Sequence, residues 1–398
     1  MKVAFVIPFY GSQIGGGAET QCRRLAENLV SRGFEVEVLT TTLKDLSTNW
    51  NHPYHDPGEY IENNVVVRRF VPRKTDTDIF VPVNERIING EELSLEEEED
   101  YSHNAVNSDA MYQFMAEHKN DYVYFFIPYL FGTSLNGSKI APEKSFLVPC
   151  LHDEGYAKMT VTRKMFQRVN GVLFNSRAEM RLAKTIYRGL PTTESILMAE
   201  GVDPVLGADG QRFRAKMRLN DTPFILYVGR RDPGKNTPTL IEYFRRYRKI
   251  NPSSSLRLIL IGPQDIEIPK DEIGYIDDLG FVSLEEKRDA IAASTLLCQP
   301  SLMESFSLVI MESWLCGRPV LVHNACEPTR EHVHDSGGGL TFDNFPEFYE
   351  AVNLLVNNPE LATLMGQKGE EYVKANFGWD VICDRFGNLL KSCTELVF

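Results

Sequence analysis

Residues 303–319 read MESFSLVIMESWLCGRP, a short apolar run bracketed by Glu304 and Glu312. Ser305 and Ser307 can cap the free backbone N–H groups at the start of a helix. Apolar residues then recur at helical spacing until a Gly-Arg-Pro sequence ends the pattern. The stretch therefore predicts a helix with Glu304 on the loop that leads into it and Glu312 about a turn and a half inside.

The start of this helix is expected to combine an anion site with two hydrogen-bond acceptors. Free N–H groups and the helix dipole favour phosphate there. Helix side chains lean toward the N-terminus, so Glu312 can point to the mouth that Glu304 borders. Carboxylates repel phosphate but accept hydroxyl groups, an arrangement that suits a nucleotide sugar. The alternative is a plain helix start, because the dipole favours a glutamate in that position in any case.

Length and composition indicate a two-domain globular protein. The 398 residues are enough for two domains of ordinary size, and the apolar share is 43%. A net charge of -13 argues against a nucleic-acid partner and against general adsorption to anionic lipid. Local basic clusters, such as Arg245-Arg246 with Arg248-Lys249, leave a peripheral membrane contact open.

The cysteines and the apolar runs predict a cytoplasmic protein. Seven cysteines are scattered without a paired motif, which is typical of a reducing compartment and predicts no structural zinc. The N-terminal apolar run is too short for a signal peptide, and no other run is long enough to span a bilayer.

Strands and helices alternate in two successive runs. The first begins with an apolar strand, a glycine-rich turn, a helix and a strand, at residues 2–9, 11–17, 18–32 and 34–40. The second begins in the same way with a strand at 224–228 and a turn that contains Gly229, Arg230 and Lys235. Two facing, doubly wound α/β domains are therefore expected, with ligands at the C-terminal ends of the strands.

Less regular segments separate these elements. Residues 43–63 are polar and without periodicity, which predicts a surface loop. The acidic run 91–100 predicts a solvated helix or a mobile loop, and residues 102–118 predict one helix. Glu200-Gly201-Val202-Asp203-Pro204 predicts a linker between the domains. The glycines after the first strand do not fit G-x-G-x-x-G, which disfavours a dinucleotide cofactor.

Four motifs together resemble the GT-B glycosyltransferases of the large retaining family often called family 4, over nearly the whole chain. They are the Gly15–Glu19 loop with its helix, the Glu200–Asp203 junction, Gly229-Arg230 with Lys235, and Glu304–Glu312 followed by Gly317–Val320. Three positions depart from the family pattern. Ser307 and Asn236 each replace a glycine, and Ala199-Glu200 replaces Pro-Asn. None of these departures removes a charged group.

The resemblance implies that the two domains bind different substrates. Residues 1–203 would form an acceptor-binding Rossmann-like domain, and residues 204–376 a nucleotide-sugar-binding one. A C-terminal helix, 377–398, would pack back on the first domain. The donor would be a nucleotide-diphosphate sugar, with UDP-glucose or a similar UDP-hexose the commonest choice, and the acceptor a saccharide or a lipid-linked saccharide. No cofactor and no metal are expected.

The resemblance also assigns site residues. Catalytic roles fall to Arg230, Lys235, His152 and Glu304, and donor-binding roles to Gly16, Gly17, Gly229, Arg230, Lys235, Gly262, Phe281, Val282, Glu304, Phe306, Ser307, Leu308 and Glu312. Glu312 would hold the ribose and Glu304 the hexose. Backbone N–H groups of residues 306–308 would meet the phosphate or the sugar.

The same resemblance implies a mechanism. Arg230 and Lys235, rather than a metal ion, would stabilise the charge of the departing diphosphate. A front-face displacement would retain the anomeric configuration, with the leaving phosphate taking the acceptor proton. Closure about residues 202–204 would exclude water. Two alternatives are a nucleotide-sugar epimerase or hydrolase and a non-catalytic nucleotide-sugar-binding protein on the same fold.

Overall fold

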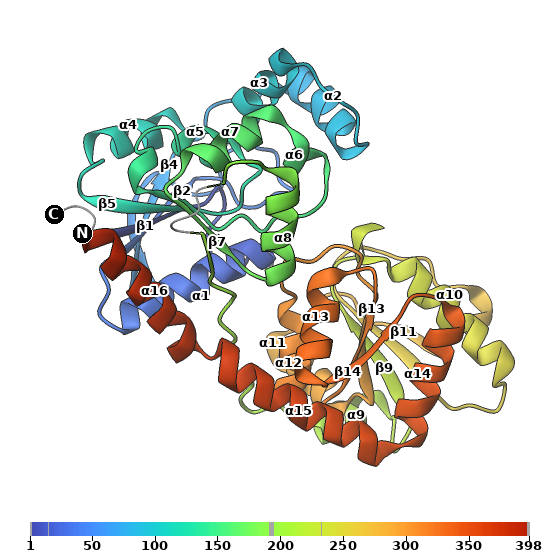
Figure 1. Ribbon diagram of the computed structural model, residues 1–398. Coiled ribbons are helices and arrows are strands. Elements are labelled where there is room, and N and C mark those ends of the chain that lie inside the picture. The colour runs from blue at the N-terminus through green and yellow to red at the C-terminus, as the bar shows by residue number, and fades with distance from the viewer. Residues whose placement is uncertain (1, 15, 191–194, 232, 396–398) are drawn as a thin grey trace. The chain divides into compact units, whose positions relative to one another are not determined.

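The computed structural model describes residues 2–14, 16–190, 195–231 and 233–395 (Figure 1). The chain divides into two compact units, Met1–Gly201 with Ile382–Phe398, and Val202–Val381. The sequence predicted residues 202–203 in the first domain and residues 377–381 in the C-terminal helix that packs on it. In the structure, both segments lie in the second unit.

The first unit is built on an eight-stranded sheet in the order β3-β4-β2-β1-β5-β6-β7-β8. The strands are β1 (Lys2–Val6), β2 (Val36–Thr41), β3 (Gly58–Glu62), β4 (Val65–Phe70), β5 (Tyr122–Phe126), β6 (Ser145–Leu147), β7 (Gly171–Phe174) and β8 (Ser195–Leu197). All pair in parallel except β3, which runs antiparallel to β4 at the edge. Every residue of β5 is buried, as expected for a parallel strand covered on both faces.

Helices cover both faces of this sheet. They are α1 (Gly17–Ser31), α2 (Thr77–Ile88), α3 (Leu95–Asn104), α4 (Asp109–Glu117), α5 (Gly132–Gly137), α6 (Gly155–Lys158), α7 (Thr160–Arg168) and α8 (Arg177–Ile186), with a 3-10 turn at Pro142–Lys144. The last helix of the chain, α16 (Trp379–Glu395), brings Phe386 within 4.7 Å of the Phe125 ring centroid. The expected return of the C-terminal helix to the first domain is confirmed.

The second unit is a six-stranded, fully parallel sheet in the order β11-β10-β9-β12-β13-β14. The strands are β9 (Phe224–Val228), β10 (Arg257–Ile261), β11 (Ile276–Asp278), β12 (Leu296–Gln299), β13 (Val320–His323) and β14 (Gly339–Phe342). The helices are α9 (Gly210–Met217), α10 (Thr237–Ile250), α11 (Leu284–Ala293), α12 (Leu308–Leu315), α13 (Glu327–Ser336), α14 (Phe345–Asn357) and α15 (Pro359–Phe377), with 3-10 turns at Pro233–Lys235 and Lys270–Glu272. The predicted doubly wound α/β class is confirmed for each unit.

Three predictions for the region between β2 and β5 need correction or sharpening. Residues 43–63 are not loop throughout, because β3 pairs with β4 within them. The acidic run enters a helix, α3, whose start is fixed by a reciprocal capping box between Ser94 and Glu97. The single helix predicted for 102–118 is two helices, α3 and α4.

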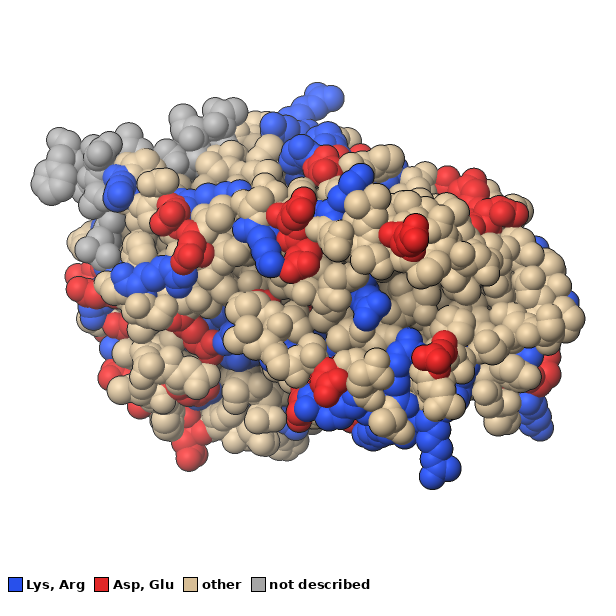
Figure 2. All heavy atoms as spheres, turned by 90° about the horizontal axis from the view of Figure 1, so that it is seen from below, with Lys and Arg blue, Asp and Glu red and all other residues tan. Residues whose placement is uncertain are grey.

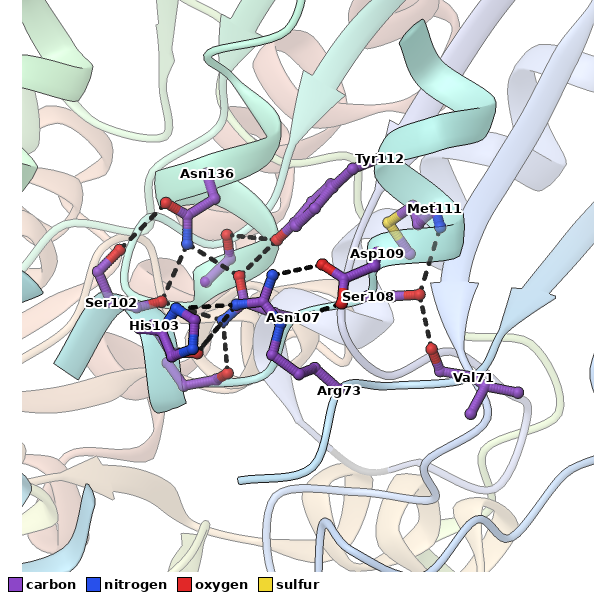
Figure 3. A network of polar contacts seen from close by, with 12 residues as sticks. Val71, Arg73, Ser102, His103, Asn107, Ser108, Asp109, Met111, Tyr112 and Asn136 are labelled. Atoms are coloured by element: carbon purple, nitrogen blue, oxygen red, sulfur yellow. Dashed lines mark hydrogen bonds and ion pairs between the residues drawn. The ribbon is translucent and has the colours of Figure 1, made fainter. Parts of the chain in front are cut away.

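The break between α3 and α4 is held by the side chain of Asn107, at the centre of the network in Figure 3. Its amide nitrogen donates to the carbonyl oxygens of Ser102, His103 and Ala105. Its amide oxygen accepts from the Tyr112 hydroxyl at 2.6 Å and from the Asn136 amide at 2.9 Å. One buried asparagine thus contacts two carbonyl groups in the last turn of α3, those of Ser102 and His103, and one just beyond it.

Candidate functional site

In the second unit, the loops after β9 and β10 are held against each other by glycines. The Gly229 N–H donates to the carbonyl of Ile261 at 2.9 Å. Gly262 has φ 144°, and a Cβ there would lie 2.0 Å from the Gly229 carbonyl oxygen. Only glycine fits this approach. Both predicted donor-binding glycines therefore shape the edge where the strands end, and their role is backbone geometry.

Lys235 and Glu304 are brought into direct contact at this edge. The Lys235 ammonium lies 2.7 Å from Oε1 of Glu304. Backbone bonds tie the two loops together, since Leu302 N–H donates to the Gly234 carbonyl at 3.0 Å and the Ser301 hydroxyl donates to the same oxygen at 3.2 Å. The two side chains are only 19% and 10% exposed, so the pair is partly desolvated and its charges are weakly screened. The structure thus joins the predicted diphosphate lysine to the predicted hexose glutamate.

A third side chain, which the sequence analysis did not single out, completes this contact. Gln299 is the last residue of β12 and is 2% exposed. Its amide nitrogen donates to the same Oε1 of Glu304 at 2.9 Å. The sequence does show a polar residue, Gln299, at the end of an otherwise apolar strand. That pattern does not indicate which loop the amide contacts.

Glu312 is paired as well, by a lysine from the neighbouring helix. Lys287 of α11 lies 2.6 Å from Oε1 of Glu312 in α12. Both side chains are roughly a quarter exposed, which leaves the carboxylate reachable by a ligand hydroxyl. Among the described residues, no hydrogen bond or ion pair joins Glu304 to Glu312, so each glutamate has its own lysine. Lys287 sits in an ordinary charged helix, and nothing in the sequence marks it.

Ser307 does not cap the helix as expected. It is the N-cap residue of α12 but has φ 80° and ψ 81°, and its side chain makes no capping hydrogen bond. Its hydroxyl is buried without a partner. The left-handed backbone favours glycine, which explains why a serine in this position is strained. The turn still presents the backbone N–H groups of the first turn of α12, beginning at Leu308.

The two consecutive arginines after β9 differ in role. Arg231 is 8% exposed, and its guanidinium bonds to Asp278 and to the carbonyl of Gln264, so it joins the loop after β9 to the loop after β10 and to the end of β11. Arg230 is exposed, and its carbonyl accepts from the Tyr227 hydroxyl. Of the two arginines, Arg230 is therefore the one exposed at the surface.

The other predicted donor-binding residues of this unit differ in how exposed their side chains are. Phe281 is 80% exposed, beyond the end of β11, and Val282 is partly exposed. The Gly262 N–H donates to the Gly280 carbonyl at 2.8 Å, which brings this turn to the β10 loop. Phe306 is fully buried, with ring centroids 5.0 Å from both His332 and Phe377. Only the backbone of Phe306 can therefore face a ligand.

Three predicted site residues lie in the first unit. Gly16 is the N-cap of α1, and Gly17 is its first residue with open space where a Cβ would be. His152 follows β6, is 30% exposed, and has Nδ1 3.8 Å from a Glu154 oxygen. These residues lie outside the unit that holds Lys235 and Glu304.

Beside His152 lies a buried carboxylate that the sequence analysis missed. Glu179 of α8 is 1% exposed and accepts the backbone N–H groups of Leu151 and Asn175 at 2.6 and 2.5 Å. Burial raises its pKa to about 7, against the lowering effect of these hydrogen bonds and of His152. The sequence showed only a capping box, Ser176 with Glu179, and not that the carboxylate would turn inward.

Within the described residues, no group of three or more His, Cys, Asp or Glu side chains could hold a metal ion. No helix in the same set is long and apolar enough to cross a membrane.

Part of the second unit is similar to known glycosyltransferases. Residues 209–372 match the family described as "Glycosyl transferases group 1". The chain is 27% identical over 172 residues to a trehalose synthase of Rubrobacter xylanophilus, covering 39% of this chain and 40% of that protein. It is 22% identical over 261 residues to a GDP-mannose-dependent monoacylated alpha-(1-6)-phosphatidylinositol monomannoside mannosyltransferase of Corynebacterium glutamicum, covering 61% and 68%.

Solved structures match over the full length. Sucrose-phosphate synthase from Thermosynechococcus elongatus superposes with a TM-score of 0.72 at 18% identity, covering 99% of each chain. Anabaena Alr3699/HepE in complex with UDP-glucose gives 0.71 at 16% identity, covering 98% of this chain and 100% of the other.

The fold is therefore GT-B, as the resemblance implied. Residues 209–372, which match the group 1 glycosyltransferase family, contain both the Lys235–Glu304 and the Lys287–Glu312 pair. The matched segment of the trehalose synthase is less than half of that protein.

Proposed function

We propose that the protein is a retaining, metal-independent family 4 glycosyltransferase that moves a hexose from a UDP-sugar, UDP-glucose or a similar one, to a saccharide or lipid-linked acceptor. The observation that carries this proposal is the Lys235–Glu304 contact at the strand ends of the second unit. A cation for the diphosphate and an acceptor for hexose hydroxyls meet there, within one hydrogen-bond length. The group 1 family match and the UDP-glucose complex of HepE support the substrate class.

Each group has a task that follows from its chemistry. Departure of the nucleoside diphosphate develops negative charge, which Lys235 and the exposed Arg230 stabilise, aided by the N–H groups at the start of α12. Glu312, reachable beside Lys287, accepts the ribose hydroxyls. Glu304 orients the hexose and does not attack it, so the leaving phosphate takes the acceptor proton. Phe281, with 80% of its surface exposed, offers an aromatic face to the base.

The acceptor and the compartment follow from broader features. A cytoplasmic location fits the scattered cysteines of the sequence, which lack a paired motif, as is typical of a reducing compartment. The family and its relatives point to saccharide or lipid-linked acceptors, as in glycoconjugate synthesis. His152, partly exposed after β6, is proposed to lie near the reacting sugar.

The test is an incubation of purified protein with UDP-, GDP- and ADP-sugars, with and without saccharide acceptors. Acceptor-dependent nucleotide release, undiminished by EDTA, is expected with a UDP-hexose. NMR of the product should show the donor's anomeric configuration. Isomerisation of the donor alone would replace this proposal with an epimerase. Binding without turnover would replace it with a nucleotide-sugar-binding protein.

A further inference from the structure

The carboxylate of Glu304 is held on one side only. Both Lys235, at 2.7 Å, and Gln299, at 2.9 Å, donate to Oε1. Within the described part of the chain, Oε2 receives no hydrogen bond or ion pair. An ionised carboxylate offers about four acceptor positions, two on each oxygen. The two protein donors therefore occupy Oε1 and leave Oε2 for hydroxyl groups of a ligand.

Gln299 is the rigid member of this arrangement. It ends β12, which pairs with β9 on one side and β13 on the other, and it is opposite Val322 in the register. The residue is 2% exposed, so its side chain has little room to move. Lys235 is by contrast 19% exposed on the loop after β9. The strand thus supplies a more deeply buried donor than the loop does.

The orientation of the Gln299 amide is determined by the carboxylate. If the amide were reversed, its oxygen would face Oε1 of Glu304 and repel it. In the observed orientation the amide oxygen is buried without a partner. Such an orphan acceptor is unfavourable, and an apolar residue would avoid it. The glutamine therefore carries a cost that a purely structural strand residue would not.

The two donors differ in how they respond to a diphosphate. An ammonium group is attracted to phosphate, so a bound nucleotide sugar competes with Glu304 for Lys235. The amide of Gln299 is neutral and does not experience this competition to the same degree. When the diphosphate attracts the Lys235 ammonium, the hydrogen bond from Gln299 still holds the Glu304 carboxylate in place.

We propose that Gln299 is a positioning residue for the sugar half of the donor: it anchors Oε1 of Glu304 so that Oε2 faces the hexose hydroxyls while Lys235 serves the diphosphate. This inference rests on the proposed function. Under this inference, Gln299 contributes to the affinity for the sugar and not to the affinity for the nucleotide. The readout is therefore the ratio of the Kd for UDP to the Kd for UDP-glucose, which isolates the contribution of the hexose.

The test compares wild type with Gln299→Met by titration calorimetry using UDP and UDP-glucose. Methionine keeps the volume of the side chain but cannot donate to Glu304. The ratio is expected to fall about tenfold, as for the loss of one hydrogen bond to a charged group, while the Kd for UDP changes less than about twofold. The control is Cys298→Ala, which perturbs the same buried strand and should leave the ratio unchanged. An unchanged ratio in Gln299→Met overturns the inference.

A ligand-free measurement separates this inference from the proposed function. Crystal structures of wild type and Gln299→Met are expected to show the Glu304 carboxylate displaced in the variant. If wild type bound neither UDP nor UDP-glucose, the proposed donor would be wrong, and the position of Glu304 would still decide the role of Gln299. An unmoved carboxylate would overturn it.

Discussion

At the scale of single residues, the site consists of paired charges whose partners come from different segments. Lys235 belongs to a 3-10 turn after β9, and Glu304 to the loop after β12, 69 positions later in the chain. Glu312 is paired across two helices by Lys287. The sequence analysis singled out Lys235, Glu304 and Glu312, because each belongs to a motif. It missed Lys287, which belongs to no motif.

Lys235→Ala is the first test at this scale. Loss of the ammonium removes the cation nearest to Glu304, so turnover should fall by about 10²–10³-fold with the fold intact. Steady-state kinetics and circular dichroism measure the two effects. The matched control is Lys216→Ala, which also breaks a 2.6 Å lysine–glutamate pair but on an exposed helix. Equal turnover in Lys235→Ala and wild type would remove Lys235 from the diphosphate site.

Ser307→Gly tests the strain at the start of α12. With φ 80° and an unpartnered buried hydroxyl, Ser307 should be less favourable than glycine by about 1 kcal/mol. Denaturant unfolding of the variant is expected to show a gain of this size. Ser305→Gly is the control, because Ser305 is not among the residues with positive φ and gains nothing from glycine. A loss of stability in Ser307→Gly would mean that the hydroxyl has a role.

At the scale of elements, buried polar side chains fix the ends of strands and helices. Asn107 bonds to the end of α3 and to Tyr112 of α4 (Figure 3), and Arg231 joins the loop after β9 to the loop after β10 and to the end of β11. Glu179 joins the ends of β6 and β7 through two backbone N–H groups. Apolar runs in the sequence predicted most of the strands, although not β3 and β14. These connections, by contrast, depend on which loops meet in space.

The raised pKa of Glu179 makes the first unit pH-sensitive. Its folded pKa of about 7 lies above its ordinary value of 4.5, so the folded state holds the extra proton between these values. The stability contribution is therefore present at low pH and lost as the pH rises through this window, by about 3 kcal/mol between pH 4.5 and 8. Glu179→Gln keeps the neutral form at every pH and should lack this component.

Urea denaturation of wild type and Glu179→Gln at several pH values checks the prediction. The variant's stability minus that of wild type should increase from pH 4.5 to pH 8. Asp209→Asn, at an exposed helix start, is a control that should not change the slope in this window. Parallel curves for wild type and Glu179→Gln would show that Glu179 does not titrate there.

At the scale of the whole molecule, the first unit is completed by the far end of the chain. Phe386 of α16 packs against Phe5 and Phe125 of the central strands, with ring centroids 5.9 and 4.7 Å away. On the face drawn in Figure 2, the acidic and basic side chains of the described residues are interspersed.

Phe386→Ala should destabilise the first unit by about 3–5 kcal/mol, the usual result of emptying a fully buried phenylalanine site. Limited proteolysis with mass spectrometry should show faster cleavage within 2–190 than within 233–377. Leu364→Ala, at a 48% exposed position of α15, is the control and should change neither rate. Uniformly faster cleavage in both units would mean that the two unfold together.

The sequence by itself determined the alternation of strands and helices, the two α/β domains and the residues at the strand ends. These follow from local periodicity and from glycines whose positions are read directly, such as Gly229 and Gly262. Only the tertiary structure decided that Lys235 and Gln299 share one oxygen of Glu304, that Ser307 does not cap α12, and that Lys287 pairs with Glu312. Such contacts join segments distant in the chain, and they form only when the sheet brings the ends of its strands to one edge.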